Sequence, residues 1–284
     1  MNKDNIIKGI IYACLILLII VCLIPFAMMI INATRSNKEI INGFSLIPGT
    51  SLKENYQNMM NLTEDIKSGA LSGIWVGFKN SLIISVSVTI LSSYFSALTA
   101  YGFYAYDFKG KNVLFVFILV IMMIPAQLGL LGFYELNKSL GTLDSYIPLI
   151  VPSIASSFTV FFLRQYLKST MHQSLIESAR IDGAGELAIF HKIALPIMLP
   201  AIATMAIFAF IGSWNNYLLP LITIFTPEKY PLPVLMGYLK GGKITENLGS
   251  VYLAITISVL PIIVAFMFLS KYIIGSISAG AVKE

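Results

Sequence analysis

Long apolar runs are the feature that most constrains the fold of this chain. Only 12% of its 284 residues are charged, whereas a soluble domain carries about 25%. A membrane-spanning helix needs about 20 consecutive, largely apolar residues. We therefore expect one all-α integral membrane domain over residues 1–284, with six transmembrane helices at about residues 9–31, 80–106, 113–134, 145–167, 197–222 and 251–275.

The basic residues indicate an orientation for these spans. With the N-terminus inside, ten of the 19 Lys and Arg residues lie in inner segments, and five of the others share one long outer loop. Basic residues near span ends favour the cytoplasm, and long loops count for less. The first apolar run is long enough to be a retained span rather than a signal peptide. We expect a multi-pass protein with both termini in the cytoplasm.

The expected spans lack the groups that several function classes require. No Asp, Glu, Lys or Arg lies in the middle of a span, which counts against coupling of transport to protons. Coupling to sodium ions bound by backbone oxygens needs no such residue and stays open. The sequence has no GxxxxGKS/T loop, HExxH or GxSxG motif. No catalysis, metal site or nucleic-acid partner is expected, and uphill transport would need energy from a partner.

The polar stretch "ESARIDGAGELAIFHKIALP" lies between the fourth and fifth expected spans, within a loop over residues 168–196. Asp182-Gly183 predicts the end of one short helix, and a second short helix leads to Leu195-Pro196. Spacings of three and four residues predict one helical face, formed by Ile176, Ala179, Gly183, Leu187 and Phe190. Periodicity alone fits either a connector resting on lipid headgroups or a docking element for a partner.

The same stretch resembles the EAA loop of permease subunits of binding-protein-dependent ABC importers. That pattern has Glu-Ala-Ala, three further residues, a Gly, nine further residues and Ile-x-Leu-Pro. The matching positions are Glu177, Ala179, Gly183, Ile193, Leu195 and Pro196, with Ser178 in place of the first Ala. "GSWNNYLLPL" (residues 212–221) and the C-terminal "GSISAGAVKE" resemble the carbohydrate-uptake branch, specifically the maltose-type second permease.

This resemblance implies a bacterial cell-membrane permease that translocates an oligosaccharide or disaccharide by alternating access. The implied partners are a second permease subunit in a heterodimer, two ATPase subunits, an extracytoplasmic solute-binding protein and membrane lipid. ATP and Mg²⁺ would act on the ATPases, and this chain would bind no cofactor. The loop would be a coupling helix that docks on the ATPase through Glu177, Ser178, Ala179, Asp182, Gly183, Ala184, Leu195 and Pro196.

Within that implied set, Glu177 would make the charged contact and Gly183 the turn, while Ala179 and Ala184 would pack against the walls of the partner's groove. The residues themselves leave two other classes open, a self-sufficient secondary transporter and a membrane scaffold that transports nothing.

Polar residues within the spans are candidates for a substrate pathway. Four of them, Gln127, Trp214, Asn215 and Asn216, fit either bonding between helices or a water-filled path for a neutral polyhydroxylated solute. The Ser and Thr residues of the second span favour packing between helices over ligand contact. Kinks are expected at Pro125, Pro200 and Pro261.

Overall fold

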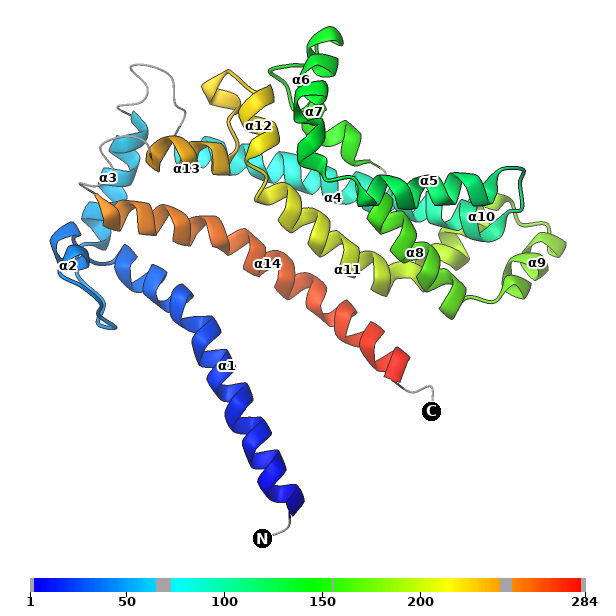
Figure 1. The fold of residues 1–284 in the computed structure, drawn as a ribbon, viewed down its shortest axis with the longest axis horizontal. Coiled ribbons are helices and arrows are strands. Elements are labelled where there is room, and N and C mark those ends of the chain that lie inside the picture. The colour runs from blue at the N-terminus through cyan, green and yellow to red at the C-terminus, as the bar shows by residue number, and fades with distance from the viewer. Residues whose placement is uncertain (1–2, 65–72, 155, 241–246, 282–284) are drawn as a thin grey trace. The chain divides into compact units, whose positions relative to one another are not determined.

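The computed structural model describes residues 3–64, 73–154, 156–240 and 247–281, whose regular secondary structure is helical, without strands (Figure 1). The expected all-α class is therefore confirmed. Five segments in the described ranges are long and apolar enough to cross a membrane: Ile7–Ala33, Ile74–Ala105, Ile147–Thr170, Glu186–Trp214 and Leu248–Ser270. A bent helix pair, Lys111–Met123 with Gln127–Ser139, makes a sixth span if it is counted as one.

The third expected span is not one straight helix. Helix α5 (Lys111–Met123) ends at Ile124, whose backbone is extended (φ −82°, ψ 119°). Proline disfavours helical geometry in the residue before it and supplies no N–H group, so Pro125 breaks the helix rather than only kinking it. A 3₁₀ turn leads into α6 (Leu130–Ser139), and the segment Gln127–Ser139 runs at 87° to α5.

The other two expected kinks lie inside continuous helices. Pro200 is within α11 (Leu195–Trp214) and Pro261 is within α14 (Leu248–Ala281). The fourth expected span consists of α7 (Ile147–Ile150), a 3₁₀ turn and α8 (Ser157–Thr170).

Contacts divide the chain into two compact units, of which residues 75–234 and 261–284 form the larger. Its core joins α8, α11 and α4 (Ile74–Ala105). Small side chains let helices approach closely, and Ala97 and Ala100 of α4 and Ala201 of α11 are all buried in this core. Two shorter helices, α12 (Leu218–Thr223) and α13 (Leu232–Lys240), follow α11.

The other unit comprises residues 1–74 and 235–260. It contains α1 (Lys3–Ala33), whose apolar side chains from Ile7 to Ile30 are mostly exposed, together with α2 (Asn37–Ile41) and α3 (Leu52–Glu64). The buried Asn55 side chain donates to the carbonyls of Ala33 and Arg35, both at 2.9 Å. These bonds hold the end of α1 against α3.

Candidate functional site

The segment after α8 folds as a helix, a glycine turn and a second helix, as predicted. Helix α9 (Gln173–Ile181) ends where Gly183 takes a left-handed backbone conformation with φ +78°. The Gly183 N–H donates to the Arg180 carbonyl and the Ala184 N–H to the Ala179 carbonyl, both at 3.0 Å. This pair of bonds is a Schellman motif, which satisfies the last carbonyls of α9.

The second helix is not separate from the fifth span, in contrast to the expectation. Helix α10 (Glu186–Ile189) continues through a π-helical turn, Phe190–Ala194, into α11. A proline inside a helix removes one hydrogen bond and crowds the carbonyl four residues earlier. The wider π turn lies directly before Pro196, where that crowding would otherwise arise, so residues 186–214 form one helical segment.

The single apolar face predicted for this segment is wrong. Ile176, Ala179 and Phe190 are buried in the core, but Gly183 and Leu187 are exposed. The turn at Gly183 interrupts the helical phase, so residues before and after it do not share a face. A different apolar set faces outward, consisting of Leu175, Ile181 and Leu187, with exposed fractions of 43%, 86% and 67%.

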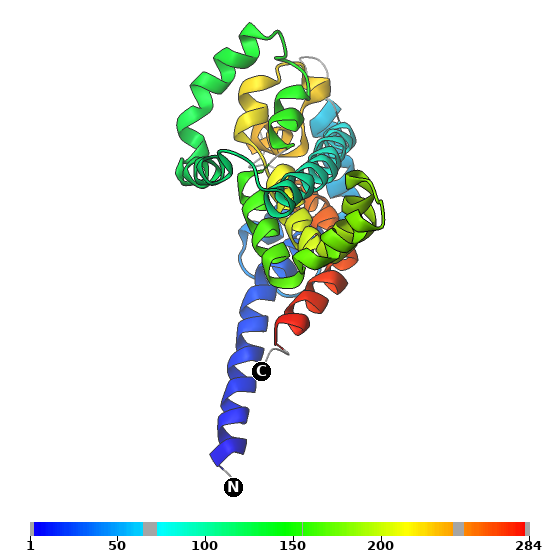
Figure 2. The same cartoon turned by 90° about the vertical axis from the view of Figure 1, so that its right-hand side faces the viewer.

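An ion pair joins α9 to α10. The Arg180 Nε atom donates to Glu186 Oε1 at 2.7 Å, and this hydrogen bond raises the pKa of Arg180. The Tyr106 hydroxyl also donates to Glu186, and the Arg180 guanidinium lies 5.3 Å from the centroid of the Tyr106 ring. We call Arg180, Glu186 and Tyr106 the clamp. It ties the two helices, which lie side by side in both views (Figure 1 and Figure 2), to the end of α4.

The structure places the eight predicted docking residues in two groups. Ala179 is buried against this chain's own core, in contrast to the expected contact with a partner's groove, and Leu195 packs on the same core. The remaining six are exposed: Glu177, Ser178, Asp182, Gly183, Ala184 and Pro196.

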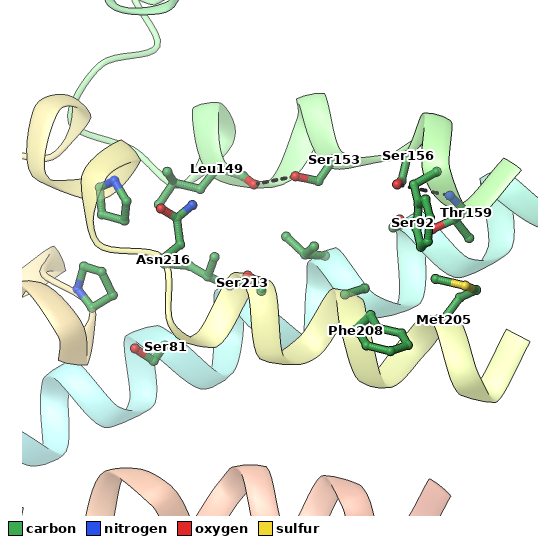
Figure 3. Close-up of a pocket in the computed structure, with 17 residues that line it drawn as sticks. Ser81, Ser92, Leu149, Ser153, Ser156, Thr159, Met205, Phe208, Ser213 and Asn216 are labelled. Carbon is green, nitrogen blue, oxygen red and sulfur yellow. Dashed lines mark hydrogen bonds between the residues drawn. The ribbon is translucent and has the colours of Figure 1, made fainter. Parts of the chain in front are cut away.

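A cavity of about 430 Å³ lies between α4, α11 and the α7–α8 region (Figure 3). Its lining contains no charged side chain. Hydroxyl groups dominate its polar surface, with one amide, Asn216, and two aromatic rings, Phe158 and Phe208. The hydroxyl residues are Ser81, Ser92, Ser153, Ser156, Thr159 and Ser213.

Of the four predicted pathway residues, Asn216 alone lines this cavity. Trp214 is buried and packs against the Phe210 and Phe78 rings, with centroid distances of 5.8 and 5.5 Å. Asn215 is exposed at the end of α11, and Gln127 is exposed in the 3₁₀ turn beside Pro125.

Sequence reasoning missed the serines of α4 as lining residues. Ser81 and Ser92 line the cavity, although the pattern of hydroxyls in the second span favoured helix packing. They are eleven residues apart, which is close to three helical turns, so they lie on one face of α4. The spacing alone predicts that the two serines share a face of the helix, but it does not show whether that face contacts a cavity or another helix.

Residues 90–278 match the family model described as the binding-protein-dependent transport system inner membrane component. The chain belongs to this family. The permease is 34% identical over 268 residues to the arabinooligosaccharides transport system permease protein AraQ of Bacillus subtilis, covering 92% of this chain and 90% of that protein. It is 28% identical over 285 residues to the diacetylchitobiose uptake system permease protein NgcG of Streptomyces coelicolor, covering 99% and 91%.

A solved structure shares the fold of the permease. It is the crystal structure of a bacterial ABC transporter involved in the import of the acidic polysaccharide alginate, with a TM-score of 0.77 and 23% identity, covering 96% of this chain and 99% of that one. The resemblance read from residues 177–196 and 212–221 is therefore confirmed at the level of the family. Membership makes the chain a multi-pass transport component rather than a catalytic subunit.

Proposed function

We propose that this permease is one transmembrane subunit of an ATP-binding-cassette importer that carries an oligosaccharide or disaccharide. The observation that supports this substrate class best is the uncharged, hydroxyl-rich cavity between α4, α8 and α11. A neutral sugar presents many hydroxyl groups, and serine hydroxyls and an amide can donate to them and accept from them. Two relatives are named for arabinooligosaccharides and for diacetylchitobiose uptake, which agrees with this class.

The exposed surface of α9 and its turn is the proposed docking site for a partner ATPase. Ile181 is 86% exposed and Leu187 is 67% exposed, and the Glu177 carboxylate lies on the same short segment. Large apolar side chains rimmed by charge are typical of a protein contact surface. Ala179 and Leu195 then contribute to docking only indirectly, because they pack α9 and α11 against the core of the permease.

The proposed motion runs from α9 to the cavity through continuous structure. The clamp joins α9 to α10, and α10 continues into α11. Helix α11 carries Ser213, and Asn216 follows two residues after its end; both line the cavity. A displacement of α9 by a closing ATPase dimer would therefore move one wall of the cavity and change its access, which is a rigid-body transition of the kind that transporters use.

The remaining parts of the proposal concern the assembly. The permease pairs with a second permease subunit, two ATPase subunits bind ATP and Mg²⁺, and a solute-binding protein delivers the sugar outside the cell. The permease itself binds no cofactor. Its residues 168–196 form the coupling loop on the cytoplasmic side, and both termini lie on that side.

Reconstitution tests this function directly. Proteoliposomes that contain the full assembly should take up a labelled arabino-oligosaccharide or diacetylchitobiose only with ATP inside and solute-binding protein outside. Vesicles with the permease alone should show no uptake under a proton or sodium gradient. Gradient-driven uptake by the permease alone would overturn the importer in favour of a secondary transporter.

A further inference from the structure

A second cavity, of about 760 Å³, lies where the α4–α5 connection meets α8. It shares no lining residue with the uncharged cavity between α4, α8 and α11. Its lining includes four cationic side chains, Lys109, Lys111, Arg164 and Lys168, against one carboxylate, Asp107. We call these five residues and the space between them the basic cavity.

Arg164 is the unusual member of this group. It lies on α8 and is only 8% exposed, and its Nε atom is buried without a hydrogen-bond partner. Among the residues that the structure describes, no carboxylate forms an ion pair with it. Its guanidinium carbon lies 3.9 Å from the centroid of the Phe115 ring. A ring face offsets part of the cost of burying a cation, but it leaves the N–H donors available for an anion.

The other charges leave the cavity strongly positive. The Lys111 ammonium is 2.9 Å from the Asp107 carboxylate and 2.7 Å from the Tyr106 carbonyl, so these two charges neutralise one another. Lys109 and Lys168 are exposed at the rim. Three cations, one of them a guanidinium suited to bidentate binding of phosphate oxygens, therefore face one space without a matching anion.

The apolar surroundings favour a lipid phosphate over a free one. Phe108 of the lining is 42% exposed, Val113 at the start of α5 is 74% exposed, and Phe117 one turn further is 60% exposed. An anionic phospholipid combines a phosphate with acyl chains, and basic pockets between helices on the cytoplasmic side are a known way to bind such headgroups. We propose that the basic cavity binds the phosphate headgroup of an anionic phospholipid, whose acyl chains lie along α5.

The position of this site connects it to the clamp. Lys111 donates to the backbone carbonyl of Tyr106, and the Tyr106 hydroxyl donates to Glu186. A headgroup that orders residues 106–111 would therefore also hold Tyr106 in place against the clamp. The inference rests on the proposed function only for placing this end of the helices on the cytoplasmic side.

The test measures lipid binding rather than uptake, so its failure is distinct from failure of the proposed function. The permease, purified with its partner subunits in detergent, is titrated with phosphatidylglycerol or phosphatidylcholine, and bound lipid is counted by native mass spectrometry. The variant is Lys109→Gln with Lys168→Gln, since both side chains are exposed and their loss leaves the core intact. Lys138→Gln, an exposed lysine on α6, is the matched control.

We expect the unmodified permease to bind phosphatidylglycerol more tightly than phosphatidylcholine. A lysine near an anionic lipid surface contributes about 1 kcal/mol, or about 5-fold in affinity, so the double variant should lose about 10-fold or more of that preference. Lys138→Gln should keep it. Equal lipid preference in the double variant and the unmodified protein would overturn the proposal.

A further measurement adds inorganic phosphate to the lipid-bound protein, at about 50 mol of phosphate per mol of lipid. The lipid assignment predicts that phosphatidylglycerol stays bound, because a free phosphate gains nothing from the apolar surface of α5. If phosphate instead displaces the lipid, and phosphatidylglycerol and phosphatidylcholine bind alike, the lipid assignment is wrong and the cavity is a site for free phosphate.

Discussion

Arg180 and Glu186 form a 2.7 Å ion pair across the glycine turn that separates α9 from α10. Both side chains are partly exposed, 35% for Arg180 and 43% for Glu186. An exposed pair of this kind contributes only about 0–1 kcal/mol to stability. Its consequence is geometric, because it holds α9 at one angle to the segment that continues into α11.

The first prediction separates coupling from stability at this pair. Arg180→Ala should lower ATP-driven uptake by about 10-fold, equivalent to roughly 1.4 kcal/mol of lost coupling, while the free energy of unfolding changes by less than about 1 kcal/mol. Uptake in proteoliposomes and thermal unfolding measure the two effects. Lys138→Ala, which breaks an exposed pair with Glu135 on α6, is the control and should leave uptake unchanged. Full uptake by Arg180→Ala would show that ATP-driven transport does not need the clamp.

The second prediction concerns the turn at Gly183, whose φ is +78°. An L side chain in the left-handed region costs about 1–2 kcal/mol, and β-branched residues fit worst there. Gly183→Val should therefore distort the turn, leave insertion intact and abolish most co-purification of the ATPase subunits. Gly183→Asn should be milder, since Asn tolerates this conformation.

Gly185 is the matched control for that turn. Its φ is −70°, and no atom lies within 4 Å of the position that a Cβ would take. Gly185→Ala should therefore retain ATPase binding and uptake. Equal behaviour of Gly183→Val and Gly185→Ala in the co-purification assay would contradict the docking role of the turn.

The third prediction uses two adjacent asparagines. Asn216 lines the uncharged cavity, whereas Asn215 is exposed at the end of α11. Asn216→Leu should reduce sugar uptake by about 10-fold through lost hydrogen bonding, since a polar contact in such a site is worth about 1–1.5 kcal/mol. Asn215→Leu makes the same chemical change outside the cavity and should leave uptake within about 2-fold of the unmodified protein (under about 0.5 kcal/mol).

The fourth prediction concerns pH and Asp144, which joins two connections of the larger unit. Its carboxylate accepts from the backbone N–H groups of Phe225 and Thr226 at 2.9 and 2.8 Å and from Lys229 Nζ at 2.8 Å. Partial burial opposes ionisation, but the hydrogen bonds from Lys229 and Thr226 outweigh it and hold the pKa of Asp144 well below its usual value.

A carboxyl group with a lowered pKa in the folded state stabilises the fold above its unfolded pKa, near 4, and that stabilisation is lost as the pH falls toward the folded value. Asp144→Asn should therefore lower the unfolding temperature at pH 7, and the gap to the unmodified protein should narrow below about pH 4. Asn also tolerates the positive φ of 54° at this position, so the backbone is kept. A gap that is independent of pH would show that the charge does not contribute.

Local sequence properties predicted the helices and the glycine turn. Hydropathy and length act over about 20 residues, so they place a span wherever an apolar run is long enough. The Gly183 turn followed from one residue, because left-handed geometry is a property of a single backbone position. A kink was expected at Pro125, and the structure shows a break with an 87° bend instead.

Which face of each helix meets a cavity or the core was decided by tertiary structure. Asn215 and Asn216 have the same side chain and are neighbours in the sequence. Both follow the end of α11 at Trp214, but of the two only Asn216 lines the cavity. Likewise, Ile176 is buried and Leu187 is exposed, although helical spacing put them on one face. Spacing describes a single unbroken helix, whereas burial depends on packing between segments that are distant in the chain.

By itself, the sequence of the permease determined its membrane class, its family and the position of the turn, because each depends on residues within one short window. The three-dimensional arrangement alone revealed the clamp, the hydroxyl lining of the uncharged cavity and the burial of Arg164 against Phe115. Each of those features joins residues from separate helices, and such pairings follow from close packing that no local pattern encodes.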